Sequence, residues 1–345
     1  LICAAALAQP LPEQPADEKK ARAERALALL KLPQARALAP QSCQLLSAKC
    51  LSILGQQDKA KETLQAARRM SPASAQDAFF AGLEAFFERS FGAARSRFHV
   101  ALQKDPRHFW AQYFLAVCHL HEAEEDQGAA RQAIAHLTAC LHRDPKFLWN
   151  YVLRGYAYGR AGDYANAEAD FEEAKRLDDQ EYAIYLNRGE MRLKQNNLEG
   201  ANQDFMQARQ LAPNRFHARL GLASLRRQQH KPKEASEFVE QAMRLAPHEA
   251  AAFAMRGHLR LDQQNLKGAL ADFEAAIERS LSSSLAKARL HLECGRILHR
   301  LGNFEDARKA YDAALARPEL KEALPLRGLT LIELGKDKEA QADFD

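Results

Sequence analysis

The chain has 345 residues, 47% hydrophobic and 27% charged, a balance typical of a folded protein and not of a disordered one. Its 49 lysines and arginines against 45 aspartates and glutamates give a net charge of +4, too small to predict binding to nucleic acid or a membrane. The six cysteines are scattered, which argues against a disulfide framework.

Residues 1–17 are expected to be a linker, or a cut leader or joining segment. "LICAAALAQP" could end a signal peptide, which would imply export, or belong to a helix joining an upstream domain, and "QPLPEQPAD" is typical of a linker. A cytoplasmic location is otherwise expected, and no apolar run approaches the roughly 18 residues of a membrane span. Residues 18–40 are expected to form irregular capping helices, broken at Pro33.

From residue 41 onward one pattern of residue sizes recurs about every 34 residues. Its anchor is an alanine, at Ala60, Ala94, Ala133, Ala167, Ala201, Ala235, Ala269, Ala307 and Ala340. Four residues later stands a large apolar residue: Leu64, Phe98, Leu137, Phe171, Phe205, Val239, Phe273, Tyr311 or Phe344. A small residue follows three positions further on, for example Ala174, and another precedes each anchor: Ala48, Gly82, Ala116, Gly155, Gly189, Ala223, Gly257, Gly295 and Gly328.

This order of small, small, large, small residues, often closed by a proline, resembles the tetratricopeptide repeat, with "YVLRGYAYGRAGDYANAEADF" as its clearest copy. The resemblance covers residues 41–345, about nine units with the last one cut, and extends to arrays of large bacterial multidomain proteins, some with a Ser/Thr protein kinase domain. It implies an all-α fold, a right-handed α-solenoid of stacked antiparallel helix pairs. We expect a left-handed turn residue between the paired helices at Gly55, Gly162, Asn196, Gly302 and Gly335.

Two charges vary together between units. Four units carry an arginine before the upstream small residue, and the same four carry an aspartate before the large apolar residue. Both members of each pair lie eight residues from the turn, hence level on opposing helices. We therefore predict four salt bridges, with a structural role: Arg154 with Asp170, Arg188 with Asp204, Arg256 with Asp272, and Arg327 with Asp343.

No motif for catalysis or cofactor binding is found, so the chain is expected not to be an enzyme and to need no cofactor or metal. The third unit holds Cys118, His119 and His121 on its first helix and His136, Cys140 and His142 on its second, and His136 and Cys140 share a helix face, so a zinc site is geometrically possible. The preferred interpretation is packing, with Cys140 at the small position of the repeat and His119 between the helices.

In the family, the first helices of the units line a concave groove through positions two, five, nine, twelve and thirteen. Applied to this sequence, the early groove is aromatic and would suit an apolar peptide or helix, through Phe79, Leu83, Phe86, Trp110, Tyr113, Val117, Trp149 and Tyr156. The alternative is that Trp110 and Trp149 pack against neighbouring helices. The later groove is basic, which favours an acidic or phosphorylated ligand unless it is simply solvated, through His217, Arg227, Arg289, Arg296, His299 and Arg300.

The leading hypothesis is a non-catalytic protein-interaction scaffold that binds a peptide or helix of a partner in its groove. The first alternative is the regulatory or substrate-docking arm of a larger Ser/Thr kinase-type protein. An RNA-binding helical repeat is disfavoured because position five is almost uniformly apolar instead of carrying a polar code. The insertions at 121–130 and 280–287 could be contact loops or tolerated surface insertions.

Overall fold

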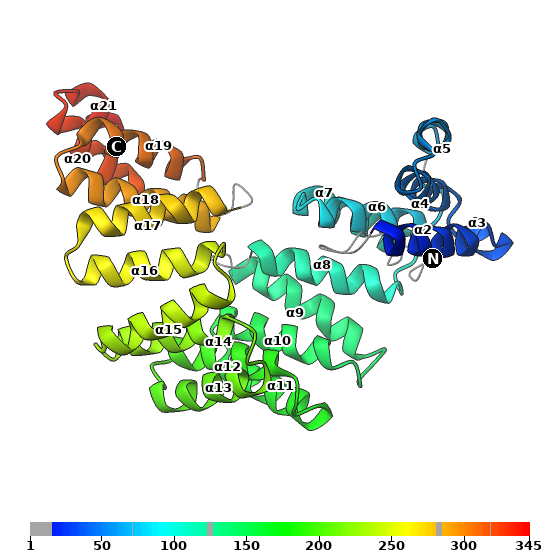
Figure 1. Cartoon of the computed structure of the whole chain (residues 1–345), viewed down its shortest axis with the longest axis horizontal. Coiled ribbons are helices and arrows are strands. Elements are labelled where there is room, and N and C mark those ends of the chain that lie inside the picture. Colours follow the sequence, from blue (N-terminus) through cyan, green and yellow to red (C-terminus); the bar gives the residue numbers. More distant parts are fainter. Residues whose placement is uncertain (1–15, 71, 123–126, 281–284, 318) are drawn as a thin grey trace. The chain divides into compact units, whose positions relative to one another are not determined.

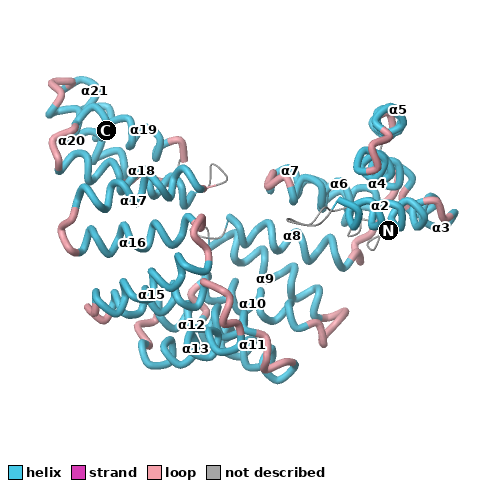
Figure 2. The backbone as a smooth tube through the Cα atoms, in the orientation of Figure 1, coloured by secondary structure: helices cyan, strands magenta, loops and turns pink. Residues whose placement is uncertain are grey.

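The computed structural model describes residues 16–70, 72–122, 127–280, 285–317 and 319–345. Within these ranges every regular element is a helix (Figures 1 and 2). The chain divides into two compact units, Leu1–Ala157 and Tyr158–Asp345, which are described one at a time. Residues 1–15, where a leader or linker was expected, and the insertion residues 123–126 and 281–284 lie outside the described part of the chain.

The helix bounds follow the period of the sequence pattern. The first unit contains α2 (Ala16–Leu30), α3 (Pro33–Leu38), α4 (Pro40–Ile53), α5 (Gln57–Arg68), α6 (Ala75–Phe87), α7 (Phe91–Lys104), α8 (Phe109–Glu122), α9 (Gln127–Leu141) and most of α10 (Leu148–Ala161). The second unit contains the end of α10 and α11 (Tyr164–Leu177), α12 (Tyr182–Lys194), α13 (Leu198–Leu211), α14 (His217–Gln228), α15 (Pro232–Leu245), α16 (Ala250–Asp262), α17 (Leu266–Arg279), α18 (Leu285–Arg300), α19 (Phe304–Leu315), α20 (Ala323–Glu333) and α21 (Asp337–Phe344).

Within each unit the helices pack as consecutive pairs. Helices α4 and α5, α6 and α7, and α8 and α9 form such pairs in the first unit, and α12 to α21 form five more in the second. The even-numbered member is here called the first helix of a repeat and the odd-numbered member the second helix. Most second helices also contact the next first helix, as α7 contacts α8 and α13 contacts α14, so these repeats bury their apolar sides against their neighbours.

The turns between paired helices end the first helix in the same way. The expected left-handed residues have positive φ, at Gly55 (79°), Gly162 (81°), Asn196 (60°), Gly302 (77°) and Gly335 (70°), which confirms that expectation. Three residues that were not expected do the same: Arg89, His230 and Gln264, with φ of 56° to 61°. At Gln264 the flanking hydrogen bonds run from its N–H to the Leu261 carbonyl (3.0 Å) and from the Asn265 N–H to the Arg260 carbonyl (2.9 Å). This is the pattern that satisfies the last carbonyls of a helix.

Small residues and aromatic rings fit together across each pair. A Cβ on Gly189, Gly257 or Gly295 would lie within 2.6–2.8 Å of the ring of Phe205, Phe273 or Tyr311. Every repeat with an aromatic residue at the large position has glycine at the upstream small position, whereas the three repeats with alanine there carry leucine or valine. The ring therefore occupies the space that a Cβ would take. All ten residues assigned to this core are buried: Gly155, Ala167, Phe171, Ala174, Gly189, Ala201, Phe205, Gly257, Ala269 and Phe273.

Two helices, α2 and α3, precede the first repeat. Pro33 is the first residue of α3 and separates it from α2, and the Ala23 and Ala26 side chains of α2 pack with Cys50 of α4. Helix α4 is hydrogen-bonded to Asp77 of α6, 35 residues further along the chain. One Asp77 carboxylate oxygen accepts from both the Ser42 N–H and the Ser42 hydroxyl at 2.9 Å. Asp77 is fully buried, so it caps the first turn of α4 within the packed core.

Among the described helices, none has both the length and the hydropathy that a membrane span needs.

Candidate functional site

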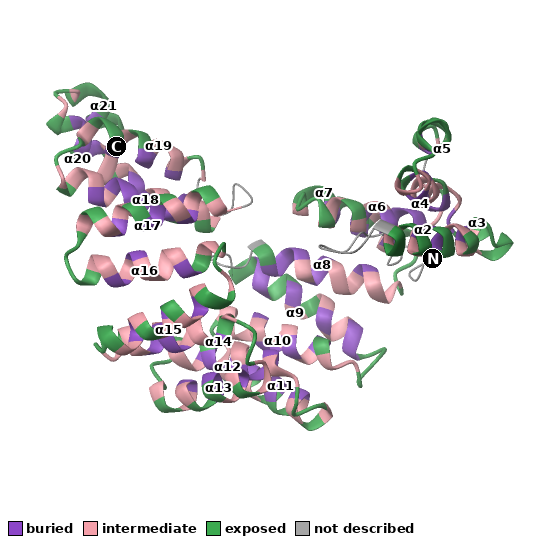
Figure 3. Cartoon of the chain, in the orientation of Figure 1, coloured by how far each residue is buried: buried purple, intermediate pink, exposed green. Residues whose placement is uncertain are grey.

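The candidate partner-binding surface of the first unit is formed by side chains of α6, α8 and the part of α10 up to Ala157. We call it the aromatic face; it comprises Leu83, Phe86, Phe87, Trp110, Tyr113, Val117, His121, Trp149 and Tyr156. None of these residues is lysine, arginine, aspartate or glutamate. All are at least partly accessible, and α8 contributes four of them. Figure 3 shows that α8 carries partly accessible residues as well as buried ones.

Phe79 was expected on this surface, but it lies in the core with 1% exposure. Its ring packs against Phe98 of the paired helix (centroids 5.9 Å apart) and against His108 and Phe114 of the next repeat (4.7 and 6.1 Å). Position five of α6 therefore lies beneath the next first helix and not on an open surface, and Phe79 leaves the candidate set.

Three rings at the start of α8 and α10 meet edge to face. The centroids of Trp110, Tyr113 and Phe147 lie 5.6–5.7 Å apart, with interplanar angles of 67° to 84°. Such edge-to-face contacts hold the rings in fixed orientations. Burial raises the pKa of Tyr113 to about 12, so its hydroxyl keeps its proton at neutral pH. Trp149 is more open, with 37% of its surface exposed.

The most exposed aromatic side chain of the face was missed from the sequence. Phe87 is 60% exposed and its ring meets that of Phe86 in a T-shaped contact, at 5.8 Å between centroids. Phe86 itself is half-buried between Phe91 and Phe114. Phe87 occupies position thirteen of its repeat, one of the groove positions, so the repeat register would have identified it.

The basic residues of the second unit are placed differently, because most of them already have acceptors. Arg227 makes a two-bond ion pair with Asp262 (2.5 and 3.0 Å), which lowers the pKa of that carboxyl. Arg296 bonds Glu293 at 2.8 Å, and Arg300 donates to the Gln264 amide oxygen at 2.8 Å. Arg289 is exposed. An anionic ligand would have to displace these acceptors, so this surface is the weaker candidate.

Three of the four expected arginine–aspartate pairs are present within the second unit. The shortest contacts are 2.8 Å for Arg188 with Asp204, 2.6 Å for Arg256 with Asp272, and 2.5 Å for Arg327 with Asp343. All three aspartate side chains are nearly inaccessible, at 3–5% exposure. A buried carboxylate that accepts two hydrogen bonds from a guanidinium group aligns the paired helices and is not accessible to a ligand. The fourth pair, Arg154 with Asp170, would join the two units and stays a prediction.

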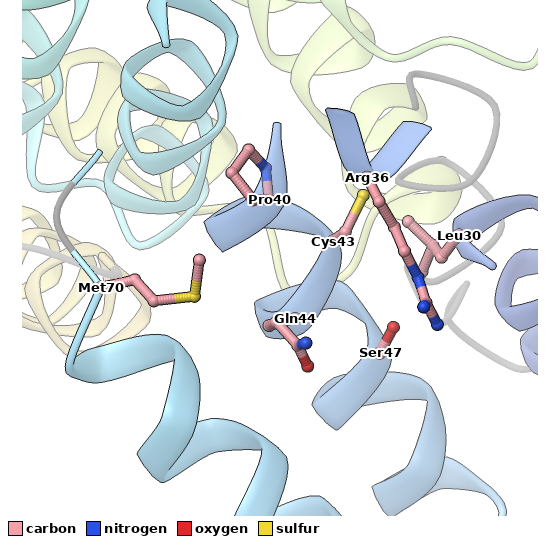
Figure 4. Close-up of a pocket in the computed structure, with 7 residues that line it drawn as sticks. All are labelled: Leu30, Arg36, Pro40, Cys43, Gln44, Ser47 and Met70. Carbon is pink, nitrogen blue, oxygen red and sulfur yellow. The ribbon is translucent and has the colours of Figure 1, made fainter. Parts of the chain in front are cut away.

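A small pocket of about 150 Å³ lies between α2, α3 and α4 and is shown in Figure 4. It is lined by Leu30, Arg36, Pro40, Cys43, Gln44, Ser47 and Met70. Burial raises the pKa of the Cys43 thiol, so the nucleophilic thiolate is disfavoured there. None of the residues that line the pocket is aspartate, glutamate or histidine.

The histidine–cysteine cluster considered for zinc is packed and not arranged around a centre. His119 and His136 stack with centroids 5.7 Å apart, and the Cys140 sulfur lies 3.7 Å from the Phe109 carbonyl oxygen. In the part of the chain that the structure describes, no three histidine, cysteine, aspartate or glutamate side chains are grouped closely enough to hold a metal ion.

Comparisons with known proteins agree with this architecture. The tetratricopeptide repeat family matches residues 152–216, 220–284 and 254–325. No curated protein matches the sequence. Among solved structures, a tetratricopeptide repeat protein from Parabacteroides merdae is 19% identical, with a TM-score of 0.56 over 74% of this chain and 98% of that one.

Two larger neighbours are similar over more of the chain. A human IFIT1 dimer with PPP-AAAA is 15% identical, with a TM-score of 0.62 over 95% of this chain and 87% of that one. Yeast Tom70 is also 15% identical, with a TM-score of 0.60 over 95% of this chain and 80% of that one. At these identities the similarity shows the fold alone, and the ligands of these proteins cannot be assigned to this chain.

Proposed function

We propose, from the premise that this chain belongs to the tetratricopeptide repeat family, that it is a non-catalytic scaffold whose aromatic face binds an apolar segment of a partner protein. Repeats of this family generally mediate protein–protein interaction. The observation that carries the proposal is the composition of the aromatic face: nine side chains on three successive first helices without a formal charge among them.

The physical reason is the cost of leaving such a surface in water. Phe87 and Trp149 expose 60% and 37% of their surface, although both are large aromatic residues. Burying a side chain of this size contributes about 1.5–3 kcal/mol, and rigid aromatic residues are the side chains that most often dominate binding energy. The edge-to-face packing of Trp110 and Tyr113 keeps this surface preorganised, so little side-chain entropy would be lost on binding.

Affinity capture with the whole chain tests the proposal. The variant Phe87→Ala with Trp149→Ala removes the two most exposed rings while leaving the core untouched, so the captured proteins should be lost or reduced about tenfold or more. The matched control, Met206→Ala with Leu245→Ala, truncates two residues that are each 40% exposed on the second helices α13 and α15. The control should capture the same proteins as the unmodified chain.

Equal loss in both variants would show that any exposed apolar residue supports the binding, and capture unchanged by the double aromatic truncation would refute the aromatic face. Circular dichroism of each variant establishes that the helices remain folded.

A further inference from the structure

We infer that the second unit binds a phosphate group at two half-buried arginines, Arg209 of α13 and Arg219 of α14. Neither arginine forms an ion pair with a carboxylate in the part of the chain that the structure describes. We call the two residues the arginine pair. It shares no residue with the aromatic face, so this inference is independent of the proposed function.

The repeat formed by α14 and α15 departs from the repeat before it at the positions of an ion pair. In the preceding repeat the Arg188 guanidinium lies over the Tyr185 ring, at 5.7 Å from its centroid, and bonds to Asp204 at 2.8 Å. Counting one repeat further along the chain, Arg219 stands in place of Tyr185, and Phe238 stands in place of Asp204. This repeat therefore has an arginine where the aromatic ring was, and it lacks the carboxylate.

The arginine pair lies where the lack of a carboxylate costs free energy, because both side chains are partly removed from water. Other half-buried arginines of this unit do have one: Arg192, Arg256 and Arg260 each have a carboxylate oxygen within 2.8 Å. Burial, and then the charge of Arg209, lowers the pKa of Arg219 below its usual value, so the two guanidinium groups repel each other. A bound anion would offset this repulsion, which favours anion binding.

The Arg219 guanidinium is held in place and keeps one edge available. Its Nη1 donates to the carbonyl oxygens of Pro213 at 2.8 Å and of Arg215 at 3.1 Å. Its Nε and Nη2 have no hydrogen-bond partner among the described residues, and neither is a fully buried atom. These two nitrogens form the edge that donates to two oxygens of one anion in parallel. The Arg209 guanidinium lies over the Phe238 ring, 6.0 Å from its centroid, which orients the second cation.

The charge of the arginine pair selects a phosphate group over a carboxylate. A carboxylate carries a single negative charge and would neutralise only one of the two guanidinium groups. A phosphate monoester carries a charge of about −1.5 to −2 at neutral pH and has three acceptor oxygens. Two of these oxygens can accept from Nε and Nη2 of Arg219, and Arg209 offsets the remaining charge. A free phosphate compound and a phosphorylated side chain of another protein both present this group.

Isothermal titration calorimetry of the full chain with sodium phosphate tests the arginine pair, with the ionic strength held constant by sodium chloride. We expect saturable binding to the unmodified chain, and binding about tenfold weaker or less for Arg209→Gln and for Arg219→Gln. Arg219→Lys keeps the charge but lacks the second parallel donor, and should weaken binding about three- to tenfold. Arg97→Gln is the matched control, because Arg97 of α7 is exposed and has no ion pair among the described residues. This control should bind phosphate as the unmodified chain does.

A labelled peptide with one phosphoserine, measured by fluorescence anisotropy beside its unphosphorylated form, distinguishes the two sources of the phosphate group. Tighter binding of the phosphopeptide than of inorganic phosphate would support a phosphorylated protein, and equal or weaker binding would support a free phosphate compound. No binding of phosphate or phosphopeptide beyond that of chloride would overturn the inference, and so would an equal loss in Arg97→Gln. Circular dichroism establishes that every variant is folded. Affinity capture at the aromatic face uses other residues, so each proposal can fail without the other.

Discussion

At the scale of single residues, Gln264 shows the cost of a left-handed turn without glycine. Its φ is 61°, in the left-handed region, where a residue with a Cβ destabilises the folded state by about 1–2 kcal/mol. Glycine avoids this strain, but part of the gain is lost because glycine gives the unfolded chain more conformational entropy. We predict that Gln264→Gly stabilises the protein by about 0.5–1 kcal/mol, measured as a higher urea midpoint. Gly302→Ala, at a φ of 77°, should destabilise by a similar amount. A lower midpoint for Gln264→Gly would contradict this.

His136 should make stability depend on pH. Burial, and to a smaller extent His99, lowers its pKa to about 4 from the ordinary value of 6.5. Between these values the unfolded chain binds a proton that the folded chain does not, so stability is fully present above about pH 6.5 and is lost as pH falls towards 4. Because His136 is half-buried, the effect should be no more than about 2 kcal/mol.

The measurement is urea unfolding at pH 7 and pH 5. His136→Gln should reduce the loss of stability on acidification. His142→Gln, at an exposed histidine just after α9, is the control and should retain it. The same pH response in the His136 variant would exclude this histidine as the source.

At the scale of helix pairs, glycine and the aromatic ring should act as one unit. Ala223 and Val239 form the small and large positions of α14 and α15. We predict that Val239→Phe alone overpacks this helix crossing and lowers the free energy of unfolding by about 1–3 kcal/mol, because the Ala223 Cβ occupies the space that the ring needs. Adding Ala223→Gly should recover about 0.5–2 kcal/mol in a double-mutant cycle of unfolding free energies.

The matched control combines Val239→Phe with Ala307→Gly, which lies in α19, two repeats further along the chain, and should be additive. If the two cycles give equal coupling energies, the glycine–ring pairing is not the cause.

The helix pairs could be predicted from the sequence because every repeat has small and large residues at the same spacing. Where the pattern is ambiguous in one repeat, the other repeats establish its register. The same register places Gln264 and His230 seven residues after the small position, where Gly162 and Gly302 stand, so their left-handed turns were also within reach. The burial of Phe79 could not be predicted in this way. It depends on how far α8 closes over α6, which is set by tertiary packing and not by the position of Phe79 in its own repeat.

At the scale of the whole molecule, repeats that contact only their neighbours should unfold with limited coupling over distance. The protein has two tryptophans, Trp110 and Trp149, and both belong to the first unit. Tryptophan fluorescence therefore reports on the first unit, whereas circular dichroism reports on all helices. Phe273, fully buried in the second unit, contacts Gly257 of its own pair and is separated from Trp149 by several repeats.

We predict that Phe273→Ala, which should cost about 3–5 kcal/mol locally, shifts the circular dichroism transition to lower urea and leaves the tryptophan transition within experimental error. Phe98→Ala, the equivalent truncation in the first unit, is the matched control and should shift the tryptophan transition. If Phe273→Ala moved both signals together, the chain would unfold as one cooperative body. Binding at the aromatic face could then respond to damage in distant repeats, whereas limited coupling would keep that face intact when the second unit is destabilised.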